Sequence, residues 1–322
     1  MLEYTGLLST IGNTPIIELK KLFSSNEFNF NVCAKLESQN PSGSTKDRSA
    51  LCMITDALNS GKINKDTTIV ESSSGNFGIA LAQICLILHL KFICVIDPKT
   101  TSQNIDLLKA YGAQLEYVEK PDMLTGEYLP ARIERVNQLL SKIPNSYNLN
   151  QYRNLCNPFA HRSTAKEIIN SFNGCLDYIF CAVSTCGTIR GYSEYIKEHN
   201  YSCKLVAVDA IGSIIFGSTI KKRLIPGHGA AIKSPLFQEG LVDDFLQVSD
   251  FDCVYGCHKL LYSEGIFAGG STGAIVSAIM KYKDTIPAGS NCVMIVHDRG
   301  DRYLDSIYSN EWINTHFKGY QL

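Results

Sequence analysis

The chain has 322 residues, with 30 basic and 31 acidic side chains and a formal net charge of -1 at pH 7. A chain of this length accommodates two domains of ordinary size, and a net charge near zero gives no reason to expect binding to nucleic acid or to an acidic membrane. The polar residues after Met1 do not form the basic and apolar segments of a signal peptide, so we expect a cytoplasmic protein.

Two features could suggest export or a membrane, and both have a simpler interpretation. Residues 79–96 form a long apolar run, but His89 and Lys91 interrupt it, which predicts a buried helix followed by a buried strand. The chain has 12 cysteines, and several lie in apolar runs rather than at disulfide spacings; we expect these to be buried, reduced side chains: Cys33, Cys52, Cys85, Cys94, Cys181 and Cys292.

Short runs rich in β-branched residues alternate with helical patterns along the whole chain. The predicted strands are residues 32–36, 68–70, 92–96, 115–118, 178–183, 205–208 and 293–296. The predicted helices lie near residues 46–60, 77–89, 102–111, 127–141, 163–171, 187–199, 251–264 and 272–283. This alternation predicts an α/β fold with parallel, doubly wound sheets, and a boundary between two lobes near residues 145–151.

The polar loop of residues 35–48 ends in a lysine and opens directly onto a helix. Asn40-Pro41 and Ser42-Gly43 are turn sequences, and Ser44 or Thr45 can cap the helix. Lys46 then lies in the first helical turn, where the macrodipole disfavours an ammonium and favours the neutral amine that forms a Schiff base. The alternative is a surface lysine on a helix.

Two further loops each follow a predicted strand and open a helix. Ser73, Ser74, Gly75 and Asn76 would bring hydroxyls and backbone N–H groups to a helix N-terminus, which is a good anion site. Residues 183–188, Val-Ser-Thr-Cys-Gly-Thr, have the same arrangement and could hold a phosphate. The alternatives are ordinary capping of a buried helix and a plain strand-to-helix turn.

The stretches 35–48, 71–80 and 264–274 resemble, in order, the motifs of the cysteine synthase and cystathionine β-synthase family of pyridoxal-phosphate (PLP) enzymes, fold type II. The resemblance runs from residues 11–15 to residues 300–304. It implies a tryptophan synthase β-like architecture with PLP at the interdomain cleft. Residues 1–12 and 36–147 would form the substrate-binding domain, and residues 13–35 and 148–322 the domain that binds the PLP phosphate.

The resemblance also implies a role for each motif residue. Lys46 would carry the cofactor and act as general base, while Asn76 would bind the phenolic oxygen and Ser271 the pyridine nitrogen. A hydroxyl partner makes the ring a weaker electron sink than an aspartate would, which favours β-elimination over transamination. The substrate carboxylate would be held by Ser73, Ser74, Gly75 and Gln151, and the cofactor phosphate by Ser184, Thr185, Cys186, Gly187 and Thr188.

Several positions depart from plain cysteine synthases. Phe77 stands where many have threonine, which predicts a lost carboxylate contact and a more apolar pocket wall, and Tyr152 stands where the family has phenylalanine. Ser184 and Cys186 replace two loop glycines, so we expect the loop to be built without positive φ angles. Cys253, Cys257 and His258 lie on an amphipathic helix, and we expect no metal site there. His228 lies in a loop that could close on substrate.

These departures, with Asp298-Arg-Gly-Asp-Arg-Tyr-Leu304, are similar to a siderophore-pathway branch of the family. That branch makes N-(2-amino-2-carboxyethyl)-L-glutamate, the first step toward 2,3-diaminopropionate, from O-phospho-L-serine and L-glutamate through an aminoacrylate. The resemblance implies a transferase, a homodimer, and a downstream NAD-dependent dehydrogenase in the same pathway. The helix that carries Tyr128 and Arg132 also matches the branch, and we expect Arg132 to select the glutamate and Tyr152 to line the substrate site.

Two alternatives remain open. The first forms the aminoacrylate in the same way, from O-acetylserine, O-phosphoserine or cysteine, and then adds sulfide as the nucleophile. The second is a regulatory paralogue that binds PLP without turnover, and it is disfavoured because Lys46, Asn76, Gln151 and Ser271 are all present.

Overall fold

The computed structural model describes residues 4–24, 27–123 and 126–319, and its contacts divide the chain into two compact units. Unit 1 comprises the described residues within Met1–Ile11 and Asn40–Cys156, and unit 2 those within Gly12–Gln39 and Asn157–Leu322. The sequence placed the second boundary after residue 147. The segment that follows belongs to unit 1, because Leu149 is buried in the core of that unit.

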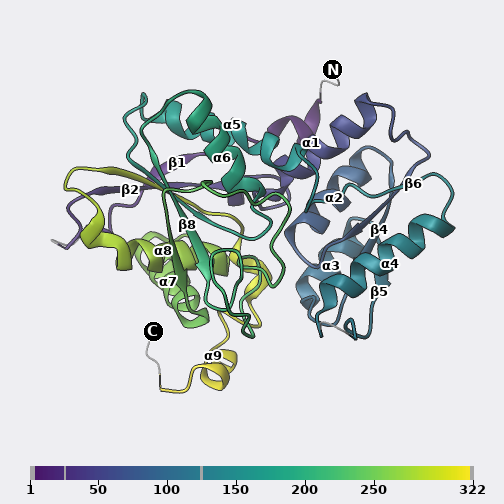
Figure 1. Ribbon diagram of the computed structural model, residues 1–322. Coiled ribbons are helices and arrows are strands. Elements are labelled where there is room, and N and C mark those ends of the chain that lie inside the picture. The colour runs from purple at the N-terminus through teal and green to yellow at the C-terminus, as the bar shows by residue number, and fades with distance from the viewer. Residues whose placement is uncertain (1–3, 25–26, 124–125, 320–322) are drawn as a thin grey trace. The chain divides into compact units, whose positions relative to one another are not determined.

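Unit 1 is built on a four-stranded sheet in the order β5-β4-β3-β6, in which every pairing is parallel (Figure 1). Its strands are β3 (Thr68–Ser72), β4 (Lys91–Ile96), β5 (Gln114–Tyr117) and β6 (Ser146–Tyr147). Its helices are α1 (Lys46–Asn59), α2 (Asn76–Ile87), α3 (Ser102–Ala110) and α4 (Tyr128–Lys142), and a 3-10 helix, η1, spans Gly6–Thr10. The strand–helix alternation read from the sequence is therefore confirmed here.

The two faces of this sheet follow from the alternation of side chains along each strand. Ile69, Phe92 and Ile96 belong to a core shared with α1 and α2. Val70 and Val95 point to the opposite face, where they pack in a separate cluster with Val136 and Leu139 of α4. Both faces of the sheet are covered, as the near-continuous apolar strands require.

Unit 2 contains a six-stranded sheet in the order β1-β2-β10-β7-β8-β9, which is parallel except for the β1–β2 pair. Its strands are β1 (Ile16–Glu18), β2 (Asn31–Lys35), β7 (Tyr178–Ala182), β8 (Lys204–Ala210), β9 (Asp244–Val248) and β10 (Asn291–Ile295). Its helices are α5 (Cys156–Ser171, whose first residue belongs to unit 1), α6 (Gly187–Glu198), α7 (Asp250–Glu264), α8 (Gly270–Tyr282) and α9 (Asn310–His316). Three 3-10 helices complete it: η2 (Glu37–Gln39), η3 (Lys283–Thr285) and η4 (Gly300–Tyr303).

The structure adds elements that the sequence patterns did not predict. The strands β1, β6 and β9 and the helix α9 were missed, and α5 begins at Cys156 rather than near residue 163. Pro158 lies in the first turn of α5, where its missing N–H breaks no helical hydrogen bond. The proline therefore marks the start of this helix.

Glycines bring α7 and α8 unusually close together. A Cβ atom at Gly273 would lie 2.0 Å from the Cys253 carbonyl oxygen, and one at Gly256 would lie 2.0 Å from the Gly273 carbonyl oxygen. The backbones of the two helices therefore touch, which fixes the N-terminal turn of α8 where Ser271 lies.

The cysteines are free thiols throughout the described ranges. Cys85, Cys94, Cys181 and Cys292 are buried as expected, whereas Cys33 and Cys52 are partly exposed. Within the same ranges, no helix combines the length and the apolar character needed to cross a membrane.

A buried ion pair joins β2 to α5 within unit 2. The Lys35 side chain is 1% exposed, and its Nζ lies 2.6 Å from Glu167 Oε2 and donates to the Thr14 carbonyl oxygen at 2.7 Å. Removing one partner of such a pair leaves an uncompensated charge, which costs far more than breaking an exposed pair.

We therefore expect Glu167→Gln to lower the free energy of unfolding by about 2 kcal/mol, a value reduced for the partial exposure of Glu167. The matched control is Glu198→Gln, which breaks the contact of α6 with Arg162 at the surface. Urea unfolding should show a clear loss only for the first variant, and equal midpoints would contradict the importance of the buried pair.

Candidate functional site

The turn that precedes Lys46 is fixed by hydrogen bonds within unit 1. Lys46 is the first residue of α1 and is half-buried, and its backbone N–H donates to Ser44 Oγ at 3.2 Å. Asp47 is 1% exposed; its carboxylate accepts from the Ser42 N–H at 2.8 Å and also contacts the Ser42 hydroxyl. Thr45 occupies the N-cap position, but its side chain makes no capping hydrogen bond. The lysine thus stands on a rigid helix start, as predicted from the loop.

The loop of Ser73, Ser74 and Gly75 follows β3 and opens α2, which begins at Asn76. Ser73 Oγ accepts the Gly78 N–H at 2.8 Å, and the Asn104 side chain donates to the Ser74 carbonyl oxygen at 3.0 Å. The Ser73 hydroxyl therefore caps the helix and keeps its own proton to donate. Capping and anion binding are compatible at this helix N-terminus.

Phe77 is 2% exposed and belongs to the hydrophobic core of unit 1. The sequence had suggested a pocket wall made more apolar by this ring. The structure instead places Phe77 in the core beneath the loop, because it is the second residue of a helix packed against the sheet.

Glu71 connects this loop to the segment before Gln151, and the sequence analysis missed it. Its carboxylate is 2% exposed and accepts from the Ser72 and Asn150 N–H groups and from the Asn148 side chain, at 3.2, 2.8 and 3.0 Å. Burial raises the pKa of Glu71 to about 7, although these hydrogen bonds and the nearby Arg132 lower it. The sequence did contain a signal for this role, namely an acidic residue that directly follows the apolar residues of a predicted strand.

Arg132 lies on α4, is 7% exposed and faces the carboxyl edge of the same sheet. Its Nε is 3.2 Å from Oδ2 of Asp97, the residue that follows β4. Its Nη1 is buried and makes no hydrogen bond within the described ranges, so one face of the guanidinium can still bind an acceptor. One turn on, Arg135 is more exposed and pairs with Glu116 at 2.5 Å. Tyr152, next to the buried Gln151, is half-buried.

In unit 2 the loop of residues 183–186 leads from β7 into α6. The expectation that this loop avoids positive φ angles is wrong: Cys186 has φ 63° and ψ 4°, in the left-handed region. Gly187 is required, since a Cβ there would lie 2.2 Å from Asn157 Oδ1. Successive N–H groups after a left-handed residue form a concave anion site, and the Thr185 and Thr188 hydroxyls lie in the same turn.

Ser271 is 5% exposed in the first turn of α8, and hydrogen bonds connect that turn to the end of β7. The His297 N–H donates to Thr272 Oγ1 at 3.1 Å, and the Ala182 N–H donates to His297 Nε2 at 3.3 Å. Because β7 and β10 are parallel neighbours, the loop of residues 183–186 and the start of α8 share one edge of the sheet. The structure thus brings the predicted phosphate loop and Ser271 together within unit 2.

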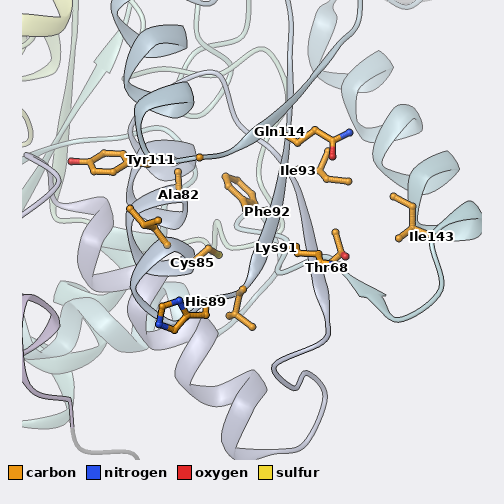
Figure 2. Close-up of a pocket in the computed structure, with 13 residues that line it drawn as sticks. Thr68, Ala82, Cys85, His89, Lys91, Phe92, Ile93, Tyr111, Gln114 and Ile143 are labelled. Carbon is orange, nitrogen blue, oxygen red and sulfur yellow. The ribbon is translucent and has the colours of Figure 1, made fainter.

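A pocket of about 620 Å³ lies at the opposite edge of the unit 1 sheet (Figure 2). It is lined by the first residues of three parallel strands, Thr68, Lys91 and Gln114, with apolar side chains such as Phe92 between them. Residues predicted to bind substrate or cofactor do not line it. In parallel sheets ligands bind at the carboxyl ends, so this pocket is separate from the candidate site.

His228 is buried rather than poised over a substrate. It is 2% exposed, its Nε2 is 3.5 Å from the Cys253 Sγ, and burial lowers its pKa to about 4. His258 Nε2 lies 2.8 Å from the Ile307 carbonyl oxygen. Both imidazoles are buried inside unit 2, which is typical of structural histidines.

A lysine at a helix start and helix N-termini at the carboxyl ends of parallel strands are typical of α/β enzymes that use an anionic cofactor. The family model described as "Pyridoxal-phosphate dependent enzyme" matches residues 7–298, and the chain belongs to this family. PLP is therefore its cofactor.

Solved structures of similar proteins cover almost the whole chain. The O-acetylserine dependent cystathionine β-synthase of Helicobacter pylori is 32% identical with a TM-score of 0.87, over 96% of this chain and 100% of that one. Isoform 3 of O-acetylserine sulfhydrylase from Entamoeba histolytica is 30% identical (TM-score 0.87; 95% and 92% covered), and O-ureido-L-serine synthase is 28% identical (TM-score 0.87; 99% and 98% covered). The chain is thus similar to PLP-dependent enzymes of β-replacement, and the resemblance to the cysteine synthase group is confirmed.

The residues present fit PLP. The turn at Cys186 and Gly187 presents successive backbone N–H groups at the start of α6, which suits a phosphate, and the Thr185 and Thr188 hydroxyls supply further donors. On the roles that the resemblance implies, Lys46 would supply the amine and Ser271 an uncharged partner for the pyridine nitrogen. When bound, the cofactor delocalises the electrons of the bond broken at the α-carbon.

The left-handed Cys186 gives a test that isolates backbone strain. We expect Cys186→Gly to be more stable than Cys186→Ala by about 1 kcal/mol, since a Cβ atom is disfavoured in this conformation. Both variants lose the buried thiol, so their difference in urea midpoint reports the backbone alone. Equal midpoints would show that the loop relaxes.

Proposed function

We propose that this protein catalyses β-replacement on O-phospho-L-serine with L-glutamate as nucleophile, giving N-(2-amino-2-carboxyethyl)-L-glutamate. The observation that carries the choice of acceptor is the buried Arg132, which has an unused donor at the carboxyl edge of the unit 1 sheet. The departures at Tyr152 and Cys186 from plain cysteine synthases support the same assignment.

The donor amino acid is held by groups of unit 1. Ser73, Ser74 and Gly75 offer hydroxyl and backbone donors at the start of α2, and Gln151 adds a side-chain amide. The α-carboxylate of the donor amino acid therefore receives several hydrogen bonds. The Lys46 amine takes the proton from the α-carbon, and phosphate leaves from the β-carbon. Ser271, being uncharged, does not hold a proton on the ring nitrogen, which favours loss of the β-substituent.

The acceptor has a second carboxylate that needs its own partner. Arg132 is suited to it because a planar guanidinium binds a carboxylate through two parallel hydrogen bonds. Its Nε lies 3.2 Å from Asp97 Oδ2, and its Nη1 has no hydrogen bond within the described residues. A buried donor without a partner costs about 1 to 3 kcal/mol, a cost that an acceptor carboxylate would remove.

A second candidate has sulfide as the nucleophile. It is favoured by the similarity to O-acetylserine sulfhydrylase of Entamoeba histolytica, whose name describes that reaction. The two candidates share the first half-reaction and differ only in what attacks the β-carbon, so product analysis separates them.

Lys46→Ala should abolish phosphate release from O-phosphoserine, because the variant lacks the amine that moves the α-proton. Lys62→Ala is the control, since Lys62 follows the same helix and pairs only with Asp56 at the surface. Phosphate release and the visible absorbance of the dialysed proteins should both be lost in the first variant alone. Normal turnover by Lys46→Ala would refute the mechanism.

Arg132→Ala should keep phosphate release but lose glutamate use. Loss of a charge-assisted pair costs about 1.5 to 3 kcal/mol, so kcat/KM for glutamate should fall by roughly one to two orders of magnitude. Arg135→Ala, on the same helix, is the control and should leave kcat/KM for glutamate unchanged. A phosphate assay measures release of the leaving group, and mass analysis of the adduct measures the use of glutamate.

Two results would refute the glutamate assignment. One is an equal loss of phosphate release and of glutamate use in Arg132→Ala. The other is rapid incorporation of sulfide by the wild-type protein with no glutamate adduct, which would establish the second candidate.

A further inference from the structure

Glu71 is a buried carboxylate that the steps above do not use. It is the fourth residue of β3, 2% exposed, and two positions before the loop of Ser73, Ser74 and Gly75. Burying a carboxylate is costly unless hydrogen bonds offset the loss of water, so a buried Glu71 needs hydrogen-bond donors around its two oxygens.

The carboxylate joins two chain segments that are far apart in the sequence. Oε1 accepts the Ser72 N–H at 3.2 Å, which holds the start of the loop. Oε2 accepts the Asn150 N–H at 2.8 Å and the Asn148 side chain at 3.0 Å, which holds the segment that leads into Gln151. The same Asn148 amide donates to the Val70 carbonyl oxygen at 2.7 Å.

The second segment has a conformation that needs such an anchor. Asn150 has φ 54°, a left-handed conformation that asparagine tolerates better than most residues. With its N–H fixed on Glu71, this residue sets the direction in which the chain continues into the buried Gln151.

We propose that Glu71 is a positioning residue for the substrate α-carboxylate, which sets the spacing between the loop of Ser73, Ser74 and Gly75 and the side chain of Gln151. The inference rests on the proposed function only in taking these two segments as the carboxylate site. Glu71 is 2% exposed and acts through the backbone N–H groups of both segments.

The charge of Glu71 gives the proposal a pH signature. Arg132 from α4, Cys94 from β4 and Tyr152 face it, and burial raises its pKa to about 7. Protonation turns one carboxylate oxygen into a hydroxyl and so weakens one of the two anchors, and donor binding should therefore weaken as the pH falls through about 7. Replacing Glu71 with an uncharged residue should remove this dependence.

The test compares Glu71→Gln with the wild-type holoenzyme. Glutamine offers one acceptor oxygen where glutamate offers two, so one of the two segments loses its anchor. We expect KM for O-phosphoserine to rise about tenfold, the equivalent of one hydrogen bond, with kcat changed less than about threefold. The wild-type KM should rise as the pH falls from 8 to 6, and this rise should be absent in the variant.

O-phosphoethanolamine, which lacks the α-carboxylate, separates positioning from general damage. Its inhibition constant should be the same in the wild type and in Glu71→Gln, while KM for O-phosphoserine differs. Equal weakening of both compounds, or an unchanged KM with an unchanged pH profile, would overturn the proposal. Glu116→Gln, on β5 and paired with Arg135, should leave both constants unchanged.

Asn148→Ala provides a second variant should Glu71→Gln not fold. It removes one donor to Oε2 and leaves the carboxylate in place, so KM should rise by about threefold with O-phosphoethanolamine inhibition unchanged. An unchanged KM in this variant would overturn the proposal. If the wild type does not use O-phosphoserine, the proposed function fails, and the same comparison is made with O-acetylserine, whose α-carboxylate is identical.

Discussion

The direction of the parallel strands is the constraint on which the candidate binding loops of each unit depend. Parallel pairing places every strand-to-helix turn at one edge of a sheet, so the loop after β3 lies at the same edge as Asp97 after β4, and the loop after β7 lies beside the segment after β10. Helix N-termini at these edges supply backbone donors for anions without any charged side chain.

The ionised groups of this protein are buried where they hold backbone segments in place. Lys35 connects β2 to α5 and to the Thr14 carbonyl, Asp47 fixes the turn before Lys46, and Glu71 joins two loops. Each of these charges has several hydrogen-bond partners, which is the condition for burial. These loops are held in place by buried charged groups as well as by apolar packing.

The sequence was sufficient for most of the regular elements and for the loops that open helices, because apolar periodicity and turn residues are local signals. It missed β1 and β9, whose few half-exposed residues have no strong alternation. It was wrong about Cys186, because tertiary contacts impose a left-handed conformation that residue type disfavours. The role of Glu71 could not be inferred either, since its partners Asn148 and Asn150 are distant in the sequence.

The position of β2 in its sheet has a consequence for biosynthesis. This strand belongs to residues 31–35, yet its parallel partner is β10, at residues 291–295. On a ribosome, the β1–β2 pair therefore waits until nearly the whole chain has emerged, while the sheet of unit 1 can form once residue 147 is available. Unit 2 must close its sheet last, and this slow, non-local pairing is the step most exposed to aggregation.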